Sequence, residues 1–77
     1  MSKDVRKLVG QNVKRLREAV TPRLSQAALA AKLGVDRAYV SSIERGQQNA
    51  TIVSLWHVSQ ALGVKIGELF EDVRRRS

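Results

Sequence analysis

Only three residues, 34–36, separate two helix-forming segments near the middle of this chain, residues 26–33 and 37–45. Gly34 ends the first segment, because glycine adopts the left-handed conformation at a helix end at little cost. Asp36 begins the second, because its carboxylate can accept hydrogen bonds from the first free backbone N–H groups of a helix. The spacing therefore predicts a tight helix–turn–helix corner, around which the rest of the chain must pack.

Apolar residues recur at three- and four-residue steps in three further segments, as expected for helices with one buried face. These segments are residues 4–20, 52–62 and 65 to about 73. Gly10 lies inside the first, where glycine costs ~1 kcal/mol relative to alanine, and this indicates a close backbone contact. No segment reads as a strand. The sequence therefore predicts an all-α fold of five helices in a single domain, residues 1–77.

The chain carries fourteen Lys and Arg residues against seven Asp and Glu residues, a net charge of +7 over 77 residues. Such an excess points to a polyanionic partner, either nucleic acid or an anionic membrane surface. There is no cysteine and one histidine, His57, so the chain lacks the residues of a disulfide framework or a Cys/His metal site. It also has no glycine-rich phosphate loop and no nucleophile–base set. We therefore expect a protein that is not an enzyme and takes no cofactor, metal or small-molecule substrate.

The distribution of apolar residues bears on location. No apolar stretch is long enough to span a membrane, and none follows the basic N-terminus as in a secretory signal. A helix lying on a membrane surface needs a large apolar face, but the apolar face of the first helix is needed for the core. We therefore expect a cytoplasmic protein with no membrane partner.

An ordered series of residues between Leu24 and Phe70 carries a family resemblance. The series is Leu24-Ser25-Gln26, Leu29-Ala30, Leu33-Gly34-Val35, Val40-Ser41, Ile43-Glu44-Arg45-Gly46, Thr51, Leu55, Ala61-Leu62-Gly63-Val64 and Leu69-Phe70. It resembles the helix-turn-helix domain of phage repressors and Cro-like regulators, the XRE family. The resemblance implies a lambda-repressor-like DNA-binding domain, with its motif at about residues 25–45 formed by the second and third helices.

Within that family, the small size and the segments 36–41 and 49–52 resemble restriction–modification controller proteins. The resemblance implies a sequence-specific transcriptional regulator that binds double-stranded DNA as a homodimer on a palindromic operator. The alternative is a DNA-binding antitoxin of a toxin–antitoxin pair, which would require a stable protein partner and an apolar patch away from the third helix.

The outward face of the third helix is compact and polar, as a helix entering the ~12 Å wide major groove must be. The residues of this face, our candidates for reading bases, are Arg37, Ala38, Ser41 and Ser42. Arginine can bind guanine through two hydrogen bonds, alanine can contact the thymine methyl group, and serine can bond to several bases. The alternative for this face is simple exposure to solvent.

Phosphate contacts are expected mainly from the resemblance. Gln26 begins the second helix, where free N–H groups attract anions, and in the family this position binds phosphate and often braces the first base reader. The other phosphate-binding candidates are Tyr39, Arg45, Gln48, Asn49 and Thr51. Thr51 is equally explained as an N-cap, and Tyr39 as a ring that packs beneath the third helix.

Two further groups of residues have structural roles. Arg17 and Glu44 match a pair that forms an internal salt bridge in the family. Residues 65–77 form the expected dimerisation region, because surplus apolar surface at a chain end is often an interface. The candidate dimer residues are Trp56, Ile66, Phe70 and Val73.

Overall fold

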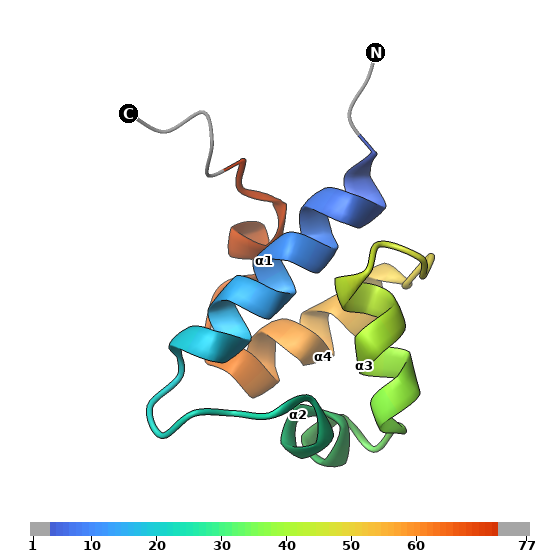
Figure 1. Ribbon diagram of the computed structural model, residues 1–77. Coiled ribbons are helices and arrows are strands. Elements are labelled where there is room, and N and C mark those ends of the chain that lie inside the picture. The colour runs from blue at the N-terminus through green and yellow to red at the C-terminus, as the bar shows by residue number, and fades with distance from the viewer. Residues whose placement is uncertain (1–3, 73–77) are drawn as a thin grey trace.

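The computed structural model describes residues 4–72 (Figure 1). Its elements are four α-helices and a 3-10 helix: α1 (Val5–Ala19), α2 (Gln26–Leu33), α3 (Arg37–Glu44), α4 (Ile52–Leu62) and η1 (Ile66–Phe70). No strand occurs between residues 4 and 72, as the sequence predicts. None of the helices in this described part combines the length and hydrophobicity needed to cross a membrane.

Local capping explains where the helices begin and end. The N-cap side chains that accept a hydrogen bond from a backbone N–H of the first turn are Asp4, Ser25, Asp36 and Thr51. Gly34 and Gly63 end α2 and α4, each with φ of 72°, a conformation that favours glycine. The bounds of α2 and α4 agree with the sequence prediction, whereas α3 ends at Glu44, one residue earlier than expected.

The prediction of a fifth α-helix from residue 65 to about 73 is wrong in kind and in length. The segment is a 3-10 helix of five residues, after which Glu71 is extended. The physical reason lies in α1: the buried side-chain amide of Asn12 donates to the carbonyl oxygens of Leu69 at 2.7 Å and Glu71 at 2.8 Å. These carbonyl groups are thus bound by α1 instead of by a further helical turn. Val73 lies outside the described residues.

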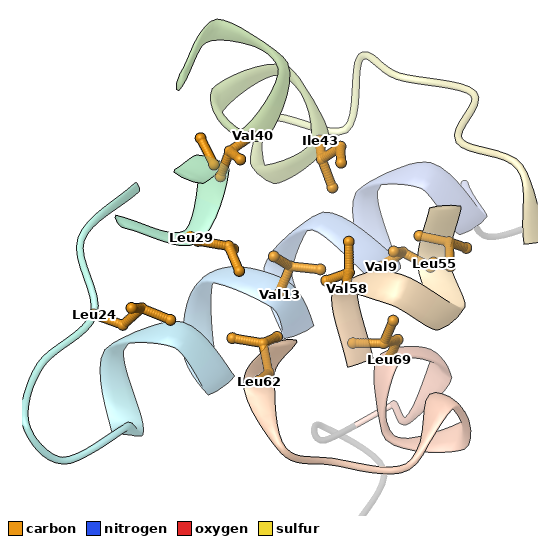
Figure 2. Close-up of a cluster of buried hydrophobic side chains, with 11 residues drawn as sticks. Val9, Val13, Leu24, Leu29, Val40, Ile43, Leu55, Val58, Leu62 and Leu69 are labelled. Atoms are coloured by element: carbon orange, nitrogen blue, oxygen red, sulfur yellow. The ribbon is translucent and has the colours of Figure 1, made fainter. Parts of the chain in front are cut away.

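The hydrophobic core lies where all five elements converge (Figure 2). Its buried side chains are Val9, Val13, Leu24, Leu29, Ala30, Val40, Ile43, Leu55, Val58, Leu62 and Leu69. Four of them come from the helix–turn–helix corner, two on α2 and two on α3. The core therefore fixes the corner against α1 and α4 and leaves the opposite face of α3 open to solvent.

Helices α1 and α3 approach each other closely at Gly10. A β-carbon added to Gly10 would lie 2.8 Å from the carbonyl oxygen of Glu44 and even closer to that of Ile43. Real β-carbons do not make such contacts, so only glycine allows this spacing. The close backbone contact predicted from Gly10 is thereby confirmed, and it brings the second turn of α1 beside the end of α3.

A candidate DNA-binding face on the helix–turn–helix corner

The corner between α2 and α3 is held by backbone and capping hydrogen bonds. The backbone N–H of Val35 donates to the carbonyl oxygen of Ala30 at 3.0 Å, and the carboxylate of Asp36 accepts from the N–H of Tyr39 at 2.9 Å. Because α3 packs against both α1 and α2 (Figure 1), only one of its faces is exposed. The corner thus presents α3 at a fixed angle, with its first turn beside the first turn of α2.

The four base-reading candidates differ in their surroundings. Arg37 and Ala38 are exposed on the first turn of α3, whereas Ser41 and Ser42 are partly buried. The guanidinium of Arg45 donates to the hydroxyl of Ser41. A role in reading bases stays a prediction for all four, and the first turn of α3 has the most open side chains.

Ser42 faces the loop that joins α3 to α4. Its hydroxyl lies 2.7 Å from the carbonyl oxygen of Tyr39 and 3.0 Å from the side-chain Oε1 of Gln48. A hydroxyl carries one proton, so it donates to one of these acceptors at a time. Gln48 is thereby tied to the middle of α3, which positions the loop that carries Asn49.

Gln26 and Arg37 lie side by side although eleven residues separate them in the sequence. The Nη1 of Arg37 donates to the Oε1 of Gln26 at 3.0 Å. The Nε2 of Gln26 in turn donates to the Oε1 of Glu44 at 2.9 Å. The structure therefore joins the first residues of α2 and α3 to the last residue of α3.

Arg17 and Glu44 form an ion pair between α1 and α3. The Nε of Arg17 lies 2.6 Å from Oε2 of Glu44, and its Nη2 lies 3.0 Å from Oε1. The two side chains are 8% and 4% exposed, and the remaining Nη1 donates to the carbonyl oxygen of Leu24 at 3.1 Å. The hydrogen bond that Arg17 donates to Glu44 raises the pKa of Arg17 above its ordinary value, against the opposing effect of burial. The guanidinium is therefore charged at every physiological pH.

The phosphate-binding candidates form two groups around α3. Gln26 and Tyr39 are partly buried, on the corner itself. The others follow α3 in the chain: Arg45, Asn49 and Thr51 are exposed, and Gln48 is partly buried. The hydroxyl of Thr51 accepts from the backbone N–H of Ser54 at 3.0 Å, so the N-cap role accounts for that oxygen. These contacts leave the phosphate assignments as predictions.

Asn12 is a structural residue that the sequence prediction missed. It is 2% exposed, and its amide holds the end of η1 while its oxygen accepts from the guanidinium of Arg15 at 3.0 Å. The signal was present, since an asparagine three residues after Val9 interrupts the apolar face of α1. A buried polar side chain needs partners, but the sequence does not show that these partners lie in η1.

A second exposed surface is apolar. Its exposed residues are Val5, Ile52, Val53, Trp56 and Phe70. Val5, Ile52 and Phe70 line a groove of about 390 Å³ between α1, α4, η1 and the loop that joins α3 to α4. Of the dimer candidates, Trp56 and Phe70 are 49% and 38% exposed, whereas Ile66 packs partly against the core. Ile52, which was not among the dimer candidates, extends this surface.

In this basic chain, the corner holds the short helix α3 with one polar face open to solvent. This arrangement is that of the helix-turn-helix DNA-binding domains. The particular family follows from direct comparison: the helix-turn-helix family HTH_3 matches residues 13–69, and the chain belongs to this family. Among residues 4–72, no group of His, Cys, Asp and Glu side chains is arranged to hold a metal ion.

Similar proteins include regulators that are named as control proteins. Control protein C.MunI of Mycoplasma sp is 40% identical over 72 residues, which cover 94% of this chain and 96% of that protein. Control protein C.BamHI of Bacillus amyloliquefaciens is 35% identical over 71 residues, which cover 92% and 86%.

A solved structure of a controller protein is also similar to this chain. The restriction-modification controller protein C.AhdI from Aeromonas hydrophila superposes with a TM-score of 0.76 at 38% identity, over 84% of this chain and 96% of that one. The chain is thus a helix-turn-helix DNA-binding transcriptional regulator, similar to restriction–modification controller proteins.

Proposed function

We propose that the chain is a sequence-specific regulator that binds a palindromic operator as a homodimer and controls a restriction–modification system. The observation that carries the DNA-reading part is the exposed first turn of α3, where Arg37 is held beside Ala38 by Gln26. Similarity to C.MunI and C.AhdI supports the biological role. Such a regulator acts on DNA in the cytoplasm, by blocking or recruiting polymerase at its site.

The chemistry of the first turn of α3 suits guanine and thymine. When α3 enters the major groove, the guanidinium of Arg37 can bind O6 and N7 of guanine, and the methyl group of Ala38 can contact a thymine methyl. Ser41 and Ser42 lie one turn further along α3 and offer hydroxyl groups. The exposed cation Arg45 and the polar residues of the following loop then meet the flanking phosphates.

The small size of α3, the helix proposed to read the bases, favours a dimer. α3 has eight residues and reaches only a few base pairs, which specifies little sequence. Pairing two copies about a two-fold axis doubles the site and makes the interface self-complementary. The exposed side chains of Trp56 and Phe70, with Ile52 beside them, supply the apolar surface for this contact. Ile66 supports it from the core side.

The test is selection of bound sequences from random duplex DNA by the full chain. We expect enrichment of one sequence whose two halves are related by a two-fold axis, with half-site centres ~34 Å apart, about one helical turn. Lys14→Ala, which removes an exposed charge from α1, should select the same sequence and serves as the matched control. Recovery of unenriched DNA, or of a site without two-fold symmetry that binds one chain, would overturn the proposal.

A further inference from the structure

A buried ion pair and an exposed base-reading side chain are connected here by a single residue. Glu44 receives two hydrogen bonds from Arg17 and one from Gln26. Gln26 then accepts from Arg37 at 3.0 Å. We call these four residues, from Arg17 through Glu44 and Gln26 to Arg37, the corner relay.

The chemistry of the corner relay allows only one orientation of the Gln26 amide. An ionised carboxylate accepts hydrogen bonds and cannot donate, whereas a guanidinium donates and cannot accept. The amide of Gln26 has one end of each kind. Its Nε2 must therefore face Glu44, which leaves Oε1 as the acceptor for Arg37. If the amide turned over, a carbonyl oxygen would face a carboxylate and an NH₂ group would face a guanidinium.

The inner end of the corner relay is rigid, whereas its outer end is not fixed by packing. The side chain of Glu44 is 4% exposed and is held by two donors of Arg17, which is itself bound to the carbonyl oxygen of Leu24. Arg37 is exposed and has a long side chain with many rotamers. The hydrogen bond that Arg37 donates to Gln26 is thus the contact that orders its guanidinium before any DNA arrives.

We propose that Glu44 is a positioning residue for base recognition: through Gln26 it holds Arg37 in the orientation that meets a base. This inference rests on the proposed function, because it requires that Arg37 read a base. It adds to the structural role of the ion pair, since a purely structural glutamate would affect stability and overall affinity but not the preference among bases at one position.

The test measures base discrimination, defined as the ratio of affinities for the selected operator and for its single-base variants at the position that Arg37→Ala relaxes. The variants are Glu44→Gln, Gln26→Met and the double variant. Glu44→Gln keeps the size of the side chain but presents an NH₂ group as well as an oxygen, so the amide of Gln26 is no longer forced into one orientation. Val58→Ala, a core truncation at a side chain 1% exposed, is the control for lost stability.

All measurements are made at a temperature at which circular dichroism shows every variant folded. We expect Glu44→Gln and Gln26→Met each to lower discrimination by about fivefold, within the roughly 5- to 150-fold that a bidentate arginine–guanine contact supplies. The double variant should lose no more than Gln26→Met alone, because both changes break the same path. Val58→Ala should keep wild-type discrimination.

Two results would overturn the inference: unchanged discrimination in Glu44→Gln, or losses that add in the double variant. Should Glu44→Gln fail to fold, Glu44→Asp replaces it, since aspartate keeps the charge opposite Arg17 but withdraws the carboxylate from Gln26. The proposed function fails separately, if Arg37→Ala relaxes no position of any selected operator. Wild-type discrimination in the Glu44 variants beside a clear effect of Arg37→Ala refutes only the inference.

Discussion

Replacing Gly10 by alanine tests whether the spacing of α1 and α3 holds the DNA-binding face in place. On an exposed helix this change would stabilise the protein by about 1 kcal/mol, because alanine is the better helix former. Here the added methyl group would lie 2.8 Å from the carbonyl oxygen of Glu44, and closer still to that of Ile43. Both obstacles are backbone atoms, so no side-chain rotation relieves the contact.

The size of the effect follows from this geometry. Ordinary van der Waals contact begins at 3.4 Å, so α1 and α3 must separate by several tenths of an ångström or more. Forcing extra atoms into a packed interior costs typically 1–3 kcal/mol, and the upper end of that range applies where two helix backbones must move. After the gain in helix propensity, we expect a net loss of about 2 kcal/mol. In a domain of this size that lowers Tm by roughly 8–16 °C.

The assay is thermal unfolding followed by circular dichroism, with Gly67→Ala as the matched control. A β-carbon at Gly67 meets nothing within 4 Å, so that variant should be as stable as the wild type or up to about 1 kcal/mol more stable. A Gly10→Ala protein that melts at or above the wild-type temperature would refute the close α1–α3 contact as the constraint on this position.

Three other predictions concern charge, the ion pair and assembly. If a dimer neutralises about 6–10 phosphates, operator affinity should fall about 10³–10⁵-fold between 50 and 200 mM salt in a titration, and a flat dependence would contradict nucleic-acid binding. Glu44→Ala should cost ~3–5 kcal/mol in chemical denaturation because it strands the buried guanidinium of Arg17, whereas Glu18→Ala, whose carboxylate is 39% exposed and 3.9 Å from Arg17, should change little. Phe70→Glu should give a folded monomer in analytical ultracentrifugation while Gln60→Glu stays dimeric, and a wild-type chain that is itself monomeric on its operator would remove the dimer model.

Much of the fold was predictable because its signals are local. Each N-cap and each glycine stop acts within one helical turn, so the bounds of α2 and α4 follow from a few adjacent residues. Gly10 indicated a close contact, since glycine destabilises a helix interior and is expected there only where a side chain would not fit. The prediction of an α-helix at residues 65–73 failed because the signal there is not local. The end of η1 is set by Asn12, 57 residues away from Leu69 in the sequence, and no local pattern in residues 65–73 reports that bond.

The candidate site was likewise predictable only in those features that depend on local sequence. Periodicity was enough to predict that Arg37 and Ala38 face outward, because that depends only on which side of α3 is apolar. It was not enough to predict that Arg45 bonds to Ser41, that Gln48 bonds to Ser42, or that Gln26 bonds to Glu44. Long polar side chains choose partners by three-dimensional proximity, and helical periodicity carries no information on that choice.

The most direct test of the central claim, that the first turn of α3 reads DNA bases, is the base preference of Arg37→Ala. Affinities of the wild type, Arg37→Ala and the charge control Lys14→Ala are measured against every single-base variant of the selected operator. We predict that Arg37→Ala loses ~1–3 kcal/mol of preference at one symmetric position per half-site and keeps the others. Lys14→Ala should retain the wild-type profile. A uniform loss of affinity in Arg37→Ala, with every base preference intact, would contradict the account and make Arg37 a backbone contact.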